Sequence, residues 1–195
     1  MQTIRLAELS DVPDILNIYK PFVTDSIVSF EYDVPSLQEM TDRINQIINI
    51  KKYPFIVLEK DEKVVAYAYA STYKERIAYQ WNVEVSVYVS PECQKQGVGR
   101  KLYSILLNMI RELGYYNAIA VIALPHDASV GLHESFGFSC ILVTKNAGYK
   151  LGAWRDVGWW QLPLRSIEND QQPTAPTKPS SHDMIKILEK AKNQQ

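Results

Sequence analysis

The sequence predicts an α+β (α/β three-layer) domain built on a mixed, mostly antiparallel β-sheet. Residues 55–59 and 64–72 are rich in β-branched and aromatic side chains and are separated by the polar residues 60–63, which indicates an antiparallel hairpin. Residues 118–124 are apolar at every position, which is typical of a strand that is covered on both faces and runs parallel to its neighbour. Apolar stripes with helical spacing elsewhere in the chain supply the outer layers.

The N-terminal third should hold one strand and two helices. Pro13 follows a capping side chain and suits the first turn of a helix, and Ser36 and Glu39 form a capping box at the start of a second one. In chain order we expect a strand over residues 3–7, a helix from Ser10 that stops at Pro21, a loop over 22–35 that can close over a site, and a helix from Ser36 to about Lys51.

The rest of the domain alternates strands and helices. Gly114 and Gly137 suit the residue after a helix, where a left-handed backbone ends it. After the hairpin we expect a charged and aromatic connection over 73–79, a central strand over 83–89, a glycine loop over 94–99, a helix from Arg100 to Leu113, the strand over 118–124, a short helix over 129–136, and strands over 139–144 and 158–164.

The composition changes after residue 165. Residues 166–183 are rich in Pro, Gln, Ser and Thr and have little to bury, so we expect a flexible linker, with one short helix over 184–192. The predicted organisation is therefore a domain over residues 1–165 and a C-terminal tail over 166–195.

Composition and charge exclude several classes of protein. The chain has 195 residues, of which 46% are hydrophobic, and its net charge of -1 argues against a nucleic-acid surface. No apolar run approaches the ~20 residues of a membrane span, and no signal segment is evident at the start, so we expect a cytoplasmic protein without membrane contact. Cys93 and Cys140 are single and far apart, which fits a reducing compartment and neither a disulfide framework nor a metal site.

The glycine loop is the strongest candidate for a binding site. Gly97 and Gly99 allow close approach of the backbone to an anion, and the first N–H groups of the following helix have no intrahelical partner. The spacing does not fit a Walker loop, and Leu102 stands where a dinucleotide fingerprint needs its third glycine. An ordinary glycine-rich turn is the structural alternative.

The motif Gln-x-x-Gly-x-Gly after a strand that ends Val-Tyr-Val resembles the coenzyme A loop of the GCN5-related N-acetyltransferases (GNAT). Residues 83–89, 120–125, 132–134 and 147–161 are similar to the phosphinothricin acetyltransferase branch of that family, and the resemblance covers about residues 3–164. It implies the GNAT acyl-CoA N-acyltransferase fold with a splayed parallel strand pair. It also implies acetyl-CoA as co-substrate, no metal, a small-molecule amine as acceptor, and a homodimer.

The resemblance assigns catalysis to two residues. Glu84 would be the general base, since an ammonium ion cannot attack a thioester until a carboxylate or a water takes its proton. His133 would lie near the coenzyme A thiol and either protonate the leaving thiolate or act as a second base, although a histidine on a short helix can equally be a core residue. A solvent-facing strand carboxylate is the alternative for Glu84. Cys93 has no adjacent histidine to activate it, so we expect an inert thiol.

Two further sets of residues follow from the resemblance. The coenzyme would be held by the main chain of the central strand, by the glycine loop and by the region after the next strand: Val87, Tyr88, Val89, Lys95, Gln96, Gly97, Val98, Gly99, Arg100, His126 and Ser135. His126 and Gly131 depart from the family pattern, which usually has Asn and Arg there. The acceptor would be bound by Phe30, Lys74, Glu75, Arg76, Tyr79, Glu84, Val85 and Ser86, where Lys74 and Arg76 can hold a carboxylate or phosphinate. A solvated hairpin end is the alternative for these two cations.

Three functions remain open from the sequence. The first is transfer of an acetyl group to the α-amine of a small amino-acid analogue such as phosphinothricin, methionine sulfoximine or methionine sulfone. The second is acetylation of another amine, such as a polyamine, an antibiotic or a peptide N-terminus. The third is a non-catalytic module that binds coenzyme A and recruits a partner through the 166–195 tail.

Overall fold

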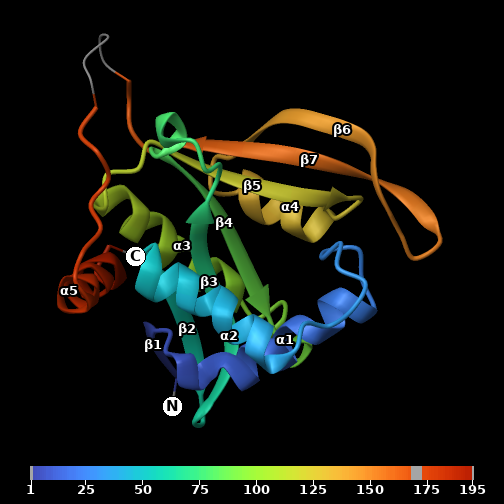
Figure 1. The fold of residues 1–195 in the computed structure, drawn as a ribbon, viewed down its shortest axis with the longest axis horizontal. Coiled ribbons are helices and arrows are strands. Elements are labelled where there is room, and N and C mark those ends of the chain that lie inside the picture. The colour runs from blue at the N-terminus through green and yellow to red at the C-terminus, as the bar shows by residue number, and fades with distance from the viewer. Residues whose placement is uncertain (1, 168–172, 195) are drawn as a thin grey trace.

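A computed structural model describes residues 2–167 and 173–194 and contains a seven-stranded β-sheet with helices on both faces (Figure 1). The strand order is β1-β2-β3-β4-β5-β7-β6, so β1 and β6 are the two edges. The strands are β1 (Gln2–Leu6), β2 (Phe55–Lys60), β3 (Lys63–Thr72), β4 (Asn82–Val89), β5 (Asn117–Leu124), β6 (Ser139–Lys150) and β7 (Ala153–Pro163). The predicted hairpin is β2–β3, and the sheet is mixed, as predicted.

One pair of neighbouring strands is parallel, and it separates after three residue pairs. β4 and β5 are paired at Asn82–Asn117, Val83–Ala118 and Glu84–Ile119, and no later pair joins them. Both strands continue, to Val89 and to Leu124, and Figure 1 shows them diverging. The fold is therefore the predicted α+β fold with a splayed parallel pair. We call residues 85–89 and 120–124 the splayed region.

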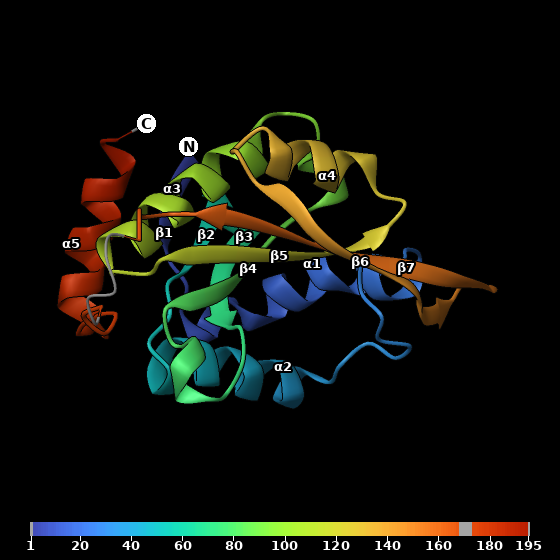
Figure 2. The same cartoon turned by 90° about the horizontal axis from the view of Figure 1, so that it is seen from above.

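The helices form two outer layers (Figure 2). One layer holds α1 (Val12–Thr24) and α2 (Leu37–Asn45), the latter continued by the π-helical turn η2 (Gln46–Ile50). The opposite layer holds α3 (Val98–Glu112) and α4 (Asp127–Glu134). Each layer buries its own apolar cluster against the sheet, with α3 supplying the larger one. Side chains of β4 therefore alternate between the two clusters.

The predicted capping box is present at the start of α2. The Ser36 hydroxyl accepts from the Glu39 N–H at 3.2 Å, and the Glu39 carboxylate accepts from the Ser36 N–H at 2.7 Å. The prediction that Pro21 ends α1 is wrong, because the helix continues to Thr24. Burial of Val23, which is 1% exposed, and of the helix face around it outweighs the hydrogen bond that proline cannot donate.

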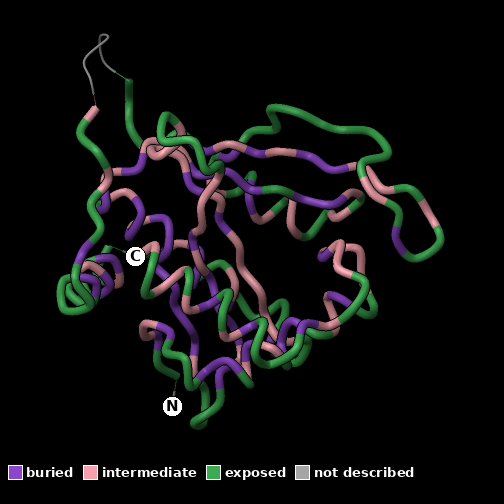
Figure 3. The backbone as a smooth tube through the Cα atoms, viewed as in Figure 1, coloured by how far each residue is buried: buried purple, intermediate pink, exposed green. Residues whose placement is uncertain are grey.

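The C-terminal hairpin is longer than predicted on both sides of its turn. β6 extends to Lys150 and β7 begins at Ala153, with Leu151 and Gly152 both at positive φ in the turn. β6 is an edge strand that is exposed along most of its length (Figure 3), so its residues carry no alternation of apolar and polar side chains from which its length could be read.

The C-terminal helix α5 (Ser181–Lys192) lies where the sequence indicated a short helix, and it packs against α3 and β1. Met184, Leu188 and Ala191 join the same buried cluster as α3. Residues 168–172 of the expected linker lie outside the described residues, whereas the Thr177 N–H donates to the Leu113 carbonyl at 2.8 Å. No helix within residues 2–167 and 173–194 is long and apolar enough to cross a membrane.

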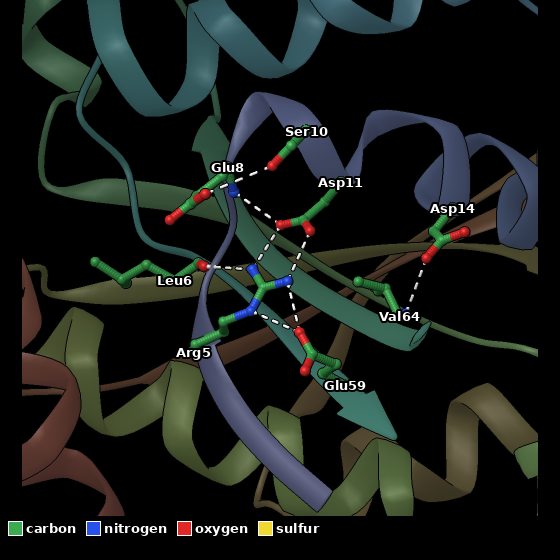
Figure 4. Close-up of polar contacts among 8 residues, drawn as sticks. All are labelled: Arg5, Leu6, Glu8, Ser10, Asp11, Asp14, Glu59 and Val64. Atoms are coloured by element: carbon green, nitrogen blue, oxygen red, sulfur yellow. Dashed lines mark hydrogen bonds and ion pairs between the residues drawn. The ribbon is translucent and has the colours of Figure 1, made fainter. Parts of the chain in front are cut away.

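An ion-pair network ties the N-terminal strand to α1 and β2 (Figure 4). The Arg5 guanidinium donates to both oxygens of Asp11 at 2.8 Å and to Glu59 at 3.0 Å. Asp11 also accepts from the Glu8 N–H at 2.8 Å. Burial alone would raise the pKa of Asp11, but the hydrogen bonds from Arg5 and Glu8 and the guanidinium charge outweigh it and lower that pKa.

Candidate active site

Glu84 occupies the last position at which β4 and β5 are paired. Val83 and Val85 are buried in the α3 cluster, so the side chain of Glu84 points to the opposite face, as do those of Ser86 and Tyr88. Glu84 is half-buried, and burial raises its pKa. The carboxylate therefore stands at the start of the splayed region with a proton affinity above that of a glutamate in water.

Tyrosines that the sequence did not single out lie on the same face of the sheet as this carboxylate. Tyr67 and Tyr69 on β3 are the register partners of Tyr88 and Ser86, and the rings of Tyr67 and Tyr88 stack at 5.0 Å. Burial raises the pKa of Tyr69 to about 12, with the charge of Glu84 as a further cause, so the phenol stays protonated. Tyr19 from α1 packs edge-on to Tyr88 at 5.4 Å. The floor of the site is thus aromatic and neutral.

The main chain of β4 offers hydrogen-bonding groups to the splayed region. The Ser90 N–H donates to the Val65 carbonyl, so Ser90 and Val65 form a hydrogen-bonded pair of the antiparallel ladder. Such pairs recur at every second residue, so the main chain of Tyr88 is bonded to that of Tyr67 on β3. Val87 and Val89 consequently direct their N–H and C=O groups toward β5, where no strand meets them, and the Val89 carbonyl accepts from the Gln94 side chain at 3.3 Å. Of the three residues predicted here, these two present main-chain groups in the splayed region, while Tyr88 contributes its ring.

The glycine loop meets two separate steric demands. Gly97 is the N-cap of α3 with φ of +78°, a conformation that L side chains rarely adopt. A Cβ on Gly99 would lie 3.3 Å from Val89 Cγ2, so this glycine lets the start of α3 lie close to β4. The main-chain N–H of Lys101 donates to the Gly97 carbonyl at 3.0 Å and is the first to do so within the helix, so the N–H groups of residues 98–100 have no acceptor within it. The start of α3 is therefore a donor cluster suited to a diphosphate.

Side chains around this loop are mostly engaged with the protein. Arg100 donates to the Ser135 hydroxyl at 2.6 Å and lies over the Phe136 ring at 4.9 Å from its centre. Gln96 donates to the Glu92 carbonyl, and Lys95 is exposed with φ of +59°. A cavity of about 330 Å³ beside them is lined by Gly97, Arg100, Lys101, Ser104 and Phe136. Val98, in contrast, is buried in the core.

The two histidines of this region have distinct roles in α4. His126 Nδ1 accepts from the Ser129 N–H at 3.0 Å and so caps the helix. His133 Nδ1 lies 2.7 Å from the Ser129 carbonyl, which can only accept, so Nδ1 carries the hydrogen. Its Nε2 is buried and has no hydrogen-bond partner in the part of the chain that the structure describes. Burial lowers the pKa of His133, so the imidazole is neutral.

The connection between β3 and β4 lies beyond Glu84 at the N-terminal end of β4. Lys74 lies between two aromatic rings, with its ammonium 5.1 Å from the Tyr73 ring centre and 4.9 Å from that of Tyr79. Arg76 is exposed, whereas Glu75 forms an ion pair with Lys51 at 3.2 Å. Two cations therefore stand at the end of β4 that is opposite to the glycine loop. Cys93 is free and buried, in keeping with an inert thiol.

The loop between α1 and α2 is joined to the β6–β7 hairpin. Phe30 packs on Gly148, where a Cβ would overlap the phenyl ring, and the Tyr32 hydroxyl donates to the Tyr149 carbonyl. The ammonium of Lys150, which is 3% exposed, donates to the carbonyls of Val23 and Ser29. Of these residues, the sequence placed Phe30 and Tyr32 in a loop that can close over a site and assigned only Phe30 to acceptor binding. The hydrogen bonds of Tyr32 and Lys150 end on main-chain carbonyls, which leave no sequence signal.

The fold, with its splayed strands and the donor cluster at the start of α3, defines an acyl-CoA-dependent acetyltransferase. The family model for the acetyltransferase (GNAT) domain matches residues 4–159, and the chain belongs to this family. Acetyl-CoA is accordingly its co-substrate, and the protein is an acetyl-CoA-dependent N-acetyltransferase. Within residues 2–167 and 173–194, no three side chains of His, Cys, Asp or Glu are grouped so as to hold a metal ion.

Relatives of known activity are similar over most of the chain. A phosphinothricin N-acetyltransferase of Streptomyces viridochromogenes is 39% identical over 81% of this chain and 85% of its own. An L-methionine sulfoximine/L-methionine sulfone acetyltransferase of Salmonella typhimurium is 31% identical over 83% of this chain and 94% of its own. The crystal structure of a phosphinothricin acetyltransferase from Sinorhizobium meliloti in complex with AcCoA superposes with a TM-score of 0.83, at 36% identity, over 89% of this chain and 93% of that one.

Proposed function

We propose that the protein acetylates the α-amine of a small amino-acid analogue of the phosphinothricin, methionine sulfoximine or methionine sulfone type, with Glu84 as general base. The observation that carries the proposal is the position of Glu84, half-buried on an aromatic floor where β4 and β5 separate. The activities of the similar enzymes support this acceptor class. Lys74 and Arg76 supply positive charge for the carboxylate or phosphinate of such an acceptor.

The coenzyme would lie along the splayed region. Main-chain groups of Val87 and Val89 would bind its pantetheine arm as a strand would, and the N–H groups of residues 98–100 would bind its diphosphate. An N–H group of β4 would also polarise the thioester carbonyl. The thioester supplies an activated acetyl group, so the protein needs only to orient the amine and take its proton.

In the proposed reaction, the Glu84 carboxylate takes one proton from the substrate ammonium, directly or through a water. The freed amine forms a bond to the acetyl carbon and the carbon–sulfur bond breaks. The proton that the nitrogen loses as it becomes an amide passes, directly or through water, to the thiolate, which leaves as a thiol. His133 does not supply that proton in this proposal, because its one N–H is bonded to Ser129 and its neutral Nε2 has none to give. We expect His133→Phe to keep kcat within about threefold, whereas general acid catalysis would contribute about 100-fold or more.

The decisive experiment is thiol release from acetyl-CoA with a panel of amines, comparing the wild-type protein with Glu84→Gln. The panel includes the three analogues, a polyamine, an aminoglycoside and a peptide. Glu84→Gln should lower kcat/KM by about 100-fold or more, the usual contribution of a general base. Glu62→Gln, in the exposed β2–β3 turn, is the matched control. An unchanged kcat/KM in Glu84→Gln removes the base role, and turnover of a different amine alone removes the acceptor class.

We further propose that the protein is a homodimer that pairs through β6. This edge strand exposes a run of three apolar residues, Ile141, Leu142 and Val143, with exposed fractions of 52%, 55% and 36%. A long apolar edge strand is a ready site for pairing with a second chain. Light scattering after size exclusion should give a dimer for the wild type and a monomer for Leu142→Lys. A monomeric wild type contradicts the proposal.

A further inference from the structure

Lys150 is a charged side chain buried where a charge is expensive. It is 3% exposed, and its ammonium lies between the last turn of α1 and the α1–α2 loop, donating to Val23 O at 2.7 Å and to Ser29 O. Burying an ammonium costs several kcal/mol unless hydrogen bonds and favourable dipoles replace its hydration. The carbonyl end of α1 provides such a dipole. An apolar side chain of the same length would avoid burying a charge but would take the donor away from both carbonyls, so the ammonium is what joins the hairpin to the loop main chain.

The contacts of Lys150 belong to a continuous seam between two distant segments of the chain. Consecutive hairpin residues Gly148, Tyr149 and Lys150 each contact the α1–α2 loop, through Phe30, through Tyr32 and through Ser29. Figure 1 shows the α1–α2 connection, in blue, reaching toward the β6–β7 hairpin. The loop has no regular secondary structure between residues 26 and 36, so side-chain contacts position it: those of this seam on one side and the Glu31–Arg43 ion pair of 2.6 Å to α2 on the other.

The same loop is connected to the floor of the active site. The Ser29 hydroxyl is 2.7 Å from the Tyr19 hydroxyl, and the Tyr19 ring packs edge-on to Tyr88, which lies one β4 side chain beyond Ser86 on the face that carries Glu84. Among the three hairpin residues of the seam, Lys150 is the one whose side chain donates hydrogen bonds to main-chain carbonyls of α1 and of the α1–α2 loop. A cation is suited to this task, since it binds two carbonyls at once and has no competing acceptor of its own.

We propose that Lys150 is a positioning residue that holds the α1–α2 loop beside the aromatic floor of the active site, so that the amine binds in a closed, oriented pocket. This inference rests on the proposed N-acetyltransfer to a small amine. The loop, and not the coenzyme region, depends on Lys150. Removing the ammonium should therefore weaken acceptor binding and leave acetyl-CoA binding intact, because the seam reaches β4 through Tyr19 and the ring of Tyr88, whereas the coenzyme would be bound by main-chain groups of β4 and by the start of α3.

The test compares Lys150→Met, which keeps the length of the side chain, with Lys145→Met on the same strand, where the lysine is 75% exposed. In Lys150→Met we expect the KM for the acceptor to rise about tenfold or more and the KM for acetyl-CoA to change by less than twofold. Amide hydrogen exchange over residues 25–35 should become faster, while exchange in α3 stays the same. Lys145→Met should match the wild type in all three measurements.

Each outcome decides the proposal. Unchanged exchange in the loop overturns it, and so does faster exchange with an unchanged acceptor KM. If Lys150→Met does not fold, Tyr32→Phe removes an exposed member of the same seam, and it should raise loop exchange and raise the acceptor KM about threefold; wild-type values for Tyr32→Phe overturn the proposal. Hydrogen exchange needs no turnover, so a protein that acetylates none of the panel amines refutes the proposed function while the loop measurement still reports on Lys150.

Discussion

The network around Arg5 predicts that Asp11→Asn destabilises the fold by about 2 kcal/mol at pH 7. The Asp11 carboxylate accepts three hydrogen bonds of 2.8 Å, two from Arg5 and one from the Glu8 N–H. Hydrogen bonds to charged groups contribute about 1.5–3 kcal/mol each, and an amide keeps one acceptor oxygen while turning a donor toward another donor. Arg5 is one-third exposed and retains Glu59, which reduces the loss to about 2 kcal/mol.

Urea unfolding at two pH values is the assay. The pKa of Asp11 is lower in the folded protein than in the unfolded chain, so its stabilisation is complete above the unfolded pKa of about 3.9 and is lost as the pH falls through the folded value. The difference between wild type and Asp11→Asn should therefore be largest at pH 7 and smaller at pH 3.

Asp14→Asn is the control on the same helix. Asp14 accepts a single hydrogen bond, from the Val64 N–H at 3.0 Å, which asparagine can also accept, so a loss below about 1 kcal/mol is expected. A loss below about 0.5 kcal/mol in Asp11→Asn, or a difference from wild type that is the same at pH 7 and pH 3, would refute the reasoning.

Three further predictions concern the glycine loop, the C-terminal helix and the base. Gly99→Ala should raise the KM for acetyl-CoA at least fivefold, because its Cβ presses on Val89, whereas Gly131→Ala, whose Cβ meets open space, should not; initial rates decide. Leu188→Ala on α5, 2% exposed in the wild type, should lower the free energy of unfolding by about 2–5 kcal/mol, and Ile185→Ala, 50% exposed, by less than about 1 kcal/mol, in urea titrations. Burial raises the pKa of Glu84, so the acid limb of kcat/KM should lie above the value of a free glutamate and disappear in Glu84→Gln; a limb near pH 4 in the wild type contradicts this.

Local signals in the sequence predicted the elements whose partners are close in the chain. The capping box at Ser36 and the β2–β3 hairpin depend on residues within a few positions of one another, and both are present. The prediction that the first helix ends at Pro21 was wrong, because burial of Val23 against the sheet, a tertiary effect, outweighs the local preference of proline. The length of β6 was missed, since an exposed edge strand needs no alternating pattern.

Residues of the candidate site were likewise predicted where a local motif marks them and missed where distant parts of the chain bring them together. Glu84 and the glycine loop were identified by a motif, and the structure places the glutamate beside the splayed region with the donor cluster at the far end of β4. Tyr67 and Tyr69 were not predicted, because they enter the site through pairing of β3 with β4. Lys150 was part of a quoted motif but received no role, since its partners are main-chain carbonyls more than 100 positions away.

The short parallel pairing of β4 with β5, three residue pairs long, affects the thermal stability of the whole sheet. Strands β1 to β4 are joined to β5, β7 and β6 by three residue pairs at one end, so bending between the two halves of the sheet meets its least resistance there. A coenzyme that occupied the gap would bridge the halves and would add RT ln(1 + [L]/Kd) to the free energy of unfolding. The melting temperature of the protein would then rise with the concentration of acyl-CoA, and the protein without coenzyme would be the less stable form.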